Sequence, residues 1–206
     1  ILGNTTTIAT FTSEVCRQYL ARYYTGPNMV FFYMGSERPS KVFKIAEKHF
    51  GSLSNQLAPI NRVIPTNVVT FDIKRDLGNH QCHTIIGSRI EGMYSEQRYP
   101  TALFTNIVGG PGMNSLLNIS LRERRGLVYT VEASSAMFTD SGAFAIYFGC
   151  DHNDHNRCRR LVLNQLHTLA SDKLSSKQIE AAKKQYLGQL IVASENREQA
   201  AISTAR

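Results

Sequence analysis

An arginine and a tyrosine in the segment 121–129 are suited to binding an oxygen atom of a substrate. The guanidinium of Arg122 and the phenol of Tyr129 both donate hydrogen bonds, so together they can grip a carbonyl oxygen or a developing oxyanion. From spacing alone the ordinary alternative is preferred: Arg122 pairs with a surface carboxylate, and Tyr129 packs with its hydroxyl at the sheet edge. The residues around the pair must decide between the two interpretations.

The histidines offer no metal site with three protein ligands. His80 and His83 are three apart in extended chain, so they point to opposite faces. His152 and His155 would share one face of a helix, but no third ligand is evident beside them. We interpret this segment as a polar helix start capped by Asp151. The motif H-x-x-E-H does not occur in the sequence.

Composition narrows the class of protein. The chain has 206 residues and a net charge of +7, with its basic residues spread along it, so we expect no nucleic-acid partner. No apolar stretch approaches the ~18 residues of a membrane span, so we expect no membrane partner. The four cysteines lack a C-x-x-C spacing and are expected to be reduced. We expect a cytoplasmic protein; the chain starts at Ile1 and reads as an excised segment, so the periplasm and organelles remain open.

The elements that position these residues follow from apolar periodicity. Helical spacing predicts helices over 12–23, 40–50, 97–108 and 113–125, one after Asp151 and one after Ser175. Alternating or continuous apolar runs predict strands over 28–34, 69–73, 82–90, 127–136 and 142–150. Residues 109–112 (Gly-Gly-Pro-Gly) form a turn rather than a phosphate loop, since no Lys-Ser/Thr follows them. The predicted fold class is α+β, with helices packed on one face of a mainly antiparallel sheet.

Two ordered motifs resemble a known family. The turn Gly-Gly-Pro-Gly-Met at 109–113 is followed by Leu-Arg-Glu-Arg-Arg-Gly-Leu-Val-Tyr at 121–129. Together with 24–35, 141–144 and the long helical end, they resemble the pitrilysin/insulinase-type zinc peptidases, or inverzincins, which include proteins like the mitochondrial processing peptidase. The part matched is the carboxyl-terminal domain, which binds no metal.

The resemblance implies a subunit of two similar α+β halves that close like a clamshell around a peptide. In the first half an H-x-x-E-H helix binds zinc, and its Glu activates water. The second half contributes an Arg and a Tyr that reach the substrate, here Arg122 and Tyr129. Two departures stand out: Leu116 lies where the family often has Arg, and the helix at 103–108 carries neither His nor Glu.

The resemblance also divides the chain. Residues 1–52 would be the tail of the first, zinc-binding half-domain, 53–66 a linker, and 67–206 a second half-domain truncated at its end. We expect the strand at 28–34 to pair with the sheet that contains Tyr129. The pairing would occur within one molecule or by exchange between two copies, which leaves a homodimer as one option.

The implied function is the substrate-holding domain of a zinc-dependent metalloendopeptidase that hydrolyses peptides in an enclosed chamber. This fragment alone would be inactive, because the zinc belongs to the missing amino-terminal half. The expected partners are peptide substrates and that half or a partner subunit. One alternative is a non-catalytic structural or partner subunit, or a binding module, of the same fold. Another is the Arg/Tyr half of a two-subunit enzyme whose zinc comes from a second chain.

Overall fold

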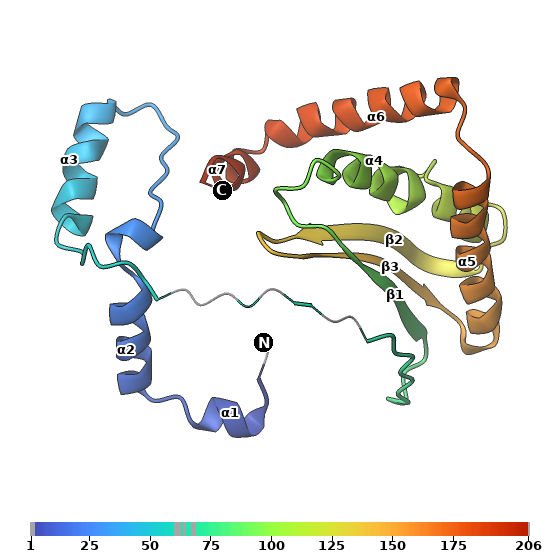
Figure 1. The fold of residues 1–206 in the computed structure, drawn as a ribbon, viewed down its shortest axis with the longest axis horizontal. Coiled ribbons are helices and arrows are strands. Elements are labelled where there is room, and N and C mark those ends of the chain that lie inside the picture. The colour runs from blue at the N-terminus through green and yellow to red at the C-terminus, as the bar shows by residue number, and fades with distance from the viewer. Residues whose placement is uncertain (1–2, 60–62, 64, 67–68, 206) are drawn as a thin grey trace. The chain divides into compact units, whose positions relative to one another are not determined.

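The computed structural model describes residues 3–59, 63, 65–66 and 69–205, which form two compact units (Figure 1). The sheet unit comprises residues 63–190. The flanking unit comprises residues 1–62 and 191–206. Each unit is described by itself.

A three-stranded antiparallel sheet forms the centre of the sheet unit. Its strands are β1 (Cys82–Ile90), β2 (Val128–Met137) and β3 (Gly142–Cys150), in the order β1-β3-β2. Each runs within a residue or two of a predicted strand. β2 therefore lies at one edge of the described sheet, joined to β3 by a tight turn in which Phe138 donates to the carbonyl of Ser141 at 2.8 Å.

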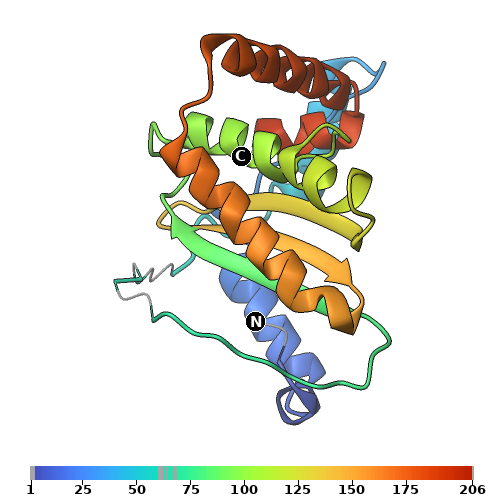
Figure 2. The same cartoon turned by 90° about the vertical axis from the view of Figure 1, so that its right-hand side faces the viewer.

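Helices cover one face of this sheet, as the sequence predicted (Figures 1 and 2). α4 (Arg98–Gly109) packs on β2, and α5 (His155–Ser171) crosses the strands. α6 (Ser176–Ser194) lies against α4, where the side chain of Asn106 donates to Gln189 at 2.6 Å. The predicted capping box is present at its start, since Ser175 and Gln178 each bond the other's amide.

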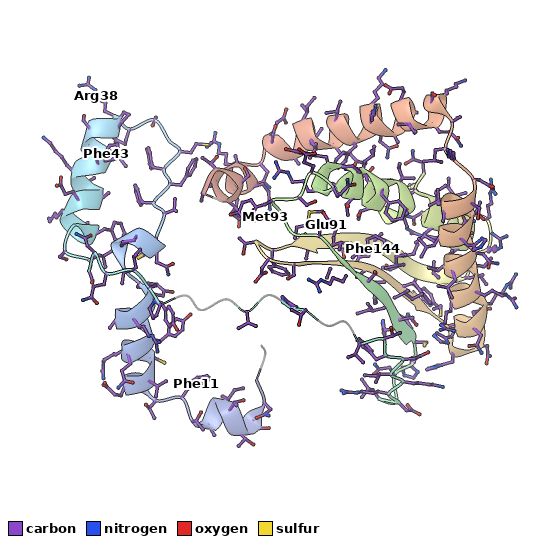
Figure 3. All side chains as sticks on the ribbon, in the orientation of Figure 1. Phe11, Arg38, Phe43, Glu91, Met93 and Phe144 are labelled. Atoms are coloured by element: carbon purple, nitrogen blue, oxygen red, sulfur yellow. The ribbon has the colours of Figure 1, made fainter. Side chains whose placement is uncertain are left out.

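The core lies between the sheet and its helices. Strand register places Ile86 opposite Ile146 and Val131 opposite Phe148, so the β-strand period of two turns these side chains to one face. Phe144, labelled in Figure 3, lies on the same face with its ring 5.6 Å from that of Phe104 in α4. Among the described residues, the buried hydrophobic side chains all fall between 108 and 162.

Two short irregular helices replace parts of the predicted ones. The helix expected over 113–125 is shorter than predicted. It is a π-helix, η2 (Asn118–Glu123), and a turn precedes it. The helix expected after Asp151 begins as a 3-10 turn, η3 (His152–Asp154), before α5. Periodicity predicts that a segment is helical but not the pitch of its first or last turn.

The flanking unit consists of short helices. They are α1 (Thr5–Ala9), α2 (Ser13–Tyr23), η1 (Gly26–Asn28), α3 (Pro39–Phe50) and α7 (Arg197–Ala205). α2 and α3 match the predicted helices, and Thr12 caps α2 as expected by accepting from Val15. No described helix of this unit contains a buried residue.

Two predicted strands are wrong. Residues 29–34 follow η1 without forming a strand, and 69–73 are not a strand either. The described sheet contains β1, β3 and β2 alone, so the expected pairing of 28–34 with the sheet of Tyr129 does not occur within this chain. Both segments have the apolar pattern of a strand, but a strand also needs a neighbour for its backbone N–H and C=O groups. Val30 and Phe71 remain exposed.

Candidate functional site

The glycine-rich turn at 109–112 is tied down from two sides. The side chains of Asn114 and Gln185 exchange hydrogen bonds at 2.6 and 3.0 Å, which fixes the turn to α6. The buried Asn118 donates to the hydroxyl of Ser115 at 3.0 Å and the carbonyl of Gly112 at 3.5 Å. A Cβ on Gly109 would come within 2.5 Å of the backbone nitrogen of Ala133 in β2, so glycine is required there by space. The turn is structural and sets the start of η2.

Arg122 lies near the end of η2. The preceding Leu121 is fully buried, which anchors the helix and leaves the Arg122 side chain on the exposed side. The π-helical pitch is visible in the amide of Arg124, which donates to the carbonyl of Ile119 at 3.1 Å, five residues back. Within the described part of the chain, no carboxylate lies at ion-pair distance from the guanidinium of Arg122. The ordinary alternative of a surface ion pair is therefore not formed there.

A single tight turn joins Arg122 to β2. Gly126 has a φ of +59°, a conformation that favours glycine, and its amide donates to the carbonyl of Arg122 at 2.8 Å. The amide of Leu127 donates to the carbonyl of Leu121 at 2.9 Å. Arg125 stabilises the same turn, because its guanidinium donates a hydrogen bond to the carbonyl of Ser120 at 2.7 Å. The local fold thus fixes the backbone between the two candidate residues, and no hydrogen bond joins their described side chains.

Tyr129 occupies a β-bulge at the start of β2. Val128 pairs with Cys150 and Thr130 with Gly149, so Tyr129 is the extra residue between them. A bulge turns a side chain out of the regular alternation of a strand. The Tyr129 side chain is 57% exposed, and its hydroxyl donates to Oδ1 of Asp151 at 3.2 Å.

Asp151 is the hydrogen-bond partner of Tyr129 that the sequence interpretation missed. It was predicted to cap the helix that follows β3, yet its side chain makes no capping hydrogen bond to η3. It faces Tyr129 instead, because it comes directly after β3, the strand beside β2. The carboxylate accepts the phenol's hydrogen bond and raises the pKa of Tyr129, its negative charge adding to the effect. Tyr129 is therefore held as the neutral phenol, which is a donor.

Three cysteines that are scattered in the sequence meet at the same end of the sheet. Cys82 and Cys150 are paired across β1 and β3, and Cys158 of α5 is buried in the same core, where its thiol donates to the carbonyl of Leu127 at 4.0 Å. Burial raises the pKa of Cys150 to about 12 and also raises that of Cys158. All four cysteines of the chain are free thiols. The fourth, Cys16, lies on α2 and is exposed.

Two of the candidate histidines, His83 and His152, make local hydrogen bonds. Nδ1 of His83 lies 2.8 Å from the hydroxyl of Tyr147, and Nε2 of His152 lies 2.9 Å from the carbonyl oxygen of Asn79. His155 stacks on Phe148 with ring centroids 6.4 Å apart. Across the residues that the structure places, no group of three or more His, Cys, Asp or Glu side chains is arranged to hold a metal ion. Zinc therefore does not fit the described residues.

Comparison with known proteins decides the family. Residues 10–186 match the family described as the peptidase M16 inactive domain, which covers most of the chain. The chain belongs to the peptidase M16 family. The pitrilysin/insulinase resemblance is thereby confirmed, and the matched part is the inactive domain of the family.

Relatives of this M16 domain are named zinc proteases. The protein named uncharacterized zinc protease YmxG, from Bacillus subtilis, is 31% identical over 196 residues, which are 95% of this chain and 47% of that protein. The chain spans about half the length of the curated relatives it matches.

Solved structures share the fold of the M16 domain. A peptidase M16 inactive domain from Pseudomonas fluorescens has a TM-score of 0.79 at 20% identity, covering 90% of this chain and 45% of that one. A chain of complex III2 from Candida albicans has a TM-score of 0.82 at 18% identity, covering 99% of this chain and 50% of that one. At these identities the likeness shows the fold, which is α+β as predicted. No helix in the described ranges has both the length and the apolarity needed to cross a membrane.

Proposed function

We propose that this M16 domain is the carboxyl-terminal, substrate-holding domain of a zinc-dependent metalloendopeptidase that hydrolyses peptides in an enclosed chamber. The observation that carries the proposal is the placement of Tyr129, an exposed phenol at a β-bulge, one tight turn after the exposed Arg122. Relatives named zinc proteases support peptidase chemistry in the intact protein.

Arg122 and Tyr129 have a shared task in this proposal. Both are hydrogen-bond donors on a backbone that is held by the buried Leu121 and by the turn at Gly126. They are therefore positioned before an oxygen of the substrate binds. A donor that binds the oxygen of a peptide carbonyl stabilises the transition state most strongly, because negative charge develops on that oxygen during hydrolysis. The Arg122 guanidinium serves as the general anchor for substrate oxygen, and Tyr129 as the directional donor.

The zinc would belong to the amino-terminal half of the intact protein. When bound there, it supplies the activated water that attacks the peptide bond. In this arrangement residues 1–52 complete that first half-domain, 53–66 link the halves, and 67–206 form the second. The exposed apolar side chains of α2 and α3 support this division, because a neighbouring domain would bury them.

We also place the intact protein in the cytoplasm. Cys150 and Cys158 are buried free thiols of one core, and a reducing compartment keeps such thiols reduced.

The proposal is tested by Tyr129→Phe in the full-length protein. We expect kcat/KM on a quenched fluorogenic peptide to fall about ten- to a thousandfold, as for the loss of one oxyanion donor, with zinc content unchanged. Tyr94→Phe is the matched control, since Tyr94 is an exposed tyrosine of the same unit outside the proposed site. Equal turnover by the two variants would refute the role of Tyr129.

The same assay distinguishes the proposed peptidase from the two alternative functions. A full-length protein that binds no zinc and cleaves no peptide would be the non-catalytic structural or partner subunit. Zinc and activity that return only on adding a second chain would indicate a two-subunit enzyme.

A further inference from the structure

Asp151 is the described residue whose side chain contacts Tyr129 through a hydrogen bond, and the sequence motif does not include it. Its Oδ1 accepts from the Tyr129 hydroxyl at 3.2 Å across the junction of β2 and β3. The carboxylate is free for this contact because it does not cap η3, the helix that it precedes.

We propose that Asp151 is a positioning residue for Tyr129, whose carboxylate keeps the phenol hydroxyl engaged and aimed until a substrate oxygen replaces it. This inference rests on the proposed function, because it assigns to Asp151 a part in the substrate contact made by Tyr129.

The bulge is the reason that Tyr129 needs such a partner. Regular strand residues are held by ladder bonds and by the packing of neighbours on each face. Tyr129 is left out of the ladder between Val128 and Thr130, and more than half of its side chain is exposed. A hydrogen bond from its far end therefore restricts a ring that packing holds only in part.

The exchange with substrate requires little movement. A phenol has one proton, which at rest points to Asp151. Rotation of the O–H bond about the Cζ–Oη axis turns that proton to a substrate oxygen while the ring stays in place. Asp151 is exposed, so water solvates its carboxylate once the hydroxyl has turned away, and the exchange leaves no buried charge unpaired.

The negative charge of Asp151 adds a second effect. It raises the pKa of Tyr129, so the phenol keeps the proton that it must donate. Asp151→Asn removes the charge and keeps an oxygen of the same shape, so it separates these effects from a loss of packing.

The experiment uses full-length protein labelled with 13C at the tyrosine Cζ. The resonance of Tyr129 is assigned by its absence in Tyr129→Phe and is titrated with pH. We expect its pKa to be lower in Asp151→Asn than in the wild type and unchanged in Asp154→Asn, which removes the same charge three residues along. An unchanged Tyr129 pKa in Asp151→Asn overturns the proposal, whether or not the protein proves to be a peptidase.

Kinetics then test the positioning role. We expect Asp151→Ala, which removes the acceptor oxygen altogether, to lower kcat/KM about two- to tenfold, the scale of ordering one side chain on binding. In a Tyr129→Phe background the same change should have no effect, because Asp151 acts through the missing hydroxyl. Equal losses in both backgrounds, or no loss in either, overturn the proposal. If Tyr129→Phe itself has full activity, the proposed function fails instead, and the titration still reports on the contact.

Discussion

The sheet unit and the flanking unit have similar fractions of apolar residues but bury them to different extents. In the sheet unit, Phe148, Leu117 and Ile146 are fully buried between the strands and the helices that cover them. In the flanking unit, α2 and α3 are amphipathic helices of ordinary length, yet Phe43 of α3 is 74% exposed. The sheet accounts for this difference. The helices of the sheet unit bury their apolar sides against it, whereas the described residues of the flanking unit form no sheet.

This contrast explains where the candidate site can be held rigidly. Arg122 and Tyr129 both stand on backbone fixed by buried neighbours, Leu121 on one side and Val128 on the other. Precise placement of donors requires such support, because a shift of about 1 Å at a reacting centre can cost a hundredfold in rate. The flanking unit has exposed apolar surface, in keeping with the proposal that residues 1–52 complete the amino-terminal half-domain.

The largest effect is expected from removing one matched aromatic side chain in each unit. Phe148→Ala should lower the free energy of unfolding by about 3–5 kcal/mol, because it leaves a cavity in a fully buried position. Phe43→Ala should change it by less than about 0.5 kcal/mol in this 206-residue chain. Urea unfolding followed by circular dichroism measures both.

Similar losses of unfolding free energy in the two variants would contradict the contrast between the units, since Phe43 would then be part of a cooperative core. Should Phe148→Ala fail to fold, Phe148→Leu gives a smaller cavity at the same position, and its cost must still exceed that of Phe43→Ala.

A smaller effect is expected in the reactivity of the cysteines. The thiolate is the nucleophile, and the pKa of Cys150 is raised to about 12, so at pH 8 this thiol stays protonated. Cys150 is also buried, whereas Cys16 of the flanking unit is exposed. We expect iodoacetamide to label Cys150 at least about a hundredfold more slowly than Cys16, as measured by peptide mass spectrometry. Equal labelling rates under native conditions would show that the sheet unit opens as readily as the flanking unit.

Periodicity was enough to predict the elements that carry their own pattern. The apolar spacing of 40–50 predicted α3, and the alternation of 142–150 predicted β3. Glycine punctuation and capping residues then placed several ends within a residue or two. The motif at 121–129 also identified Arg122 and Tyr129 as candidates, which remains a prediction.

Partnership between distant segments was not predictable in the same way. Residues 28–34 and 69–73 have the composition of strands but pair with no strand in the described part of the chain, and the local sequence does not indicate whether a segment has a pairing partner. The contact of Asp151 with Tyr129 depends on which strands are adjacent, and on the bulge that turns the tyrosine. An acidic residue before a helix is usually a cap, so the sequence favoured the local partner over the distant one.

Amide hydrogen exchange tests most directly the claim that the sheet unit is stable on its own, whereas the helices of the flanking unit need a neighbouring domain. The amides should be compared between this 206-residue chain and the full-length protein. We predict strong protection of β1, β3 and α4 in both, and protection of α2 and α3 in the full-length protein alone. Protection of α2 and α3 in the 206-residue chain equal to that of β3 would contradict the account.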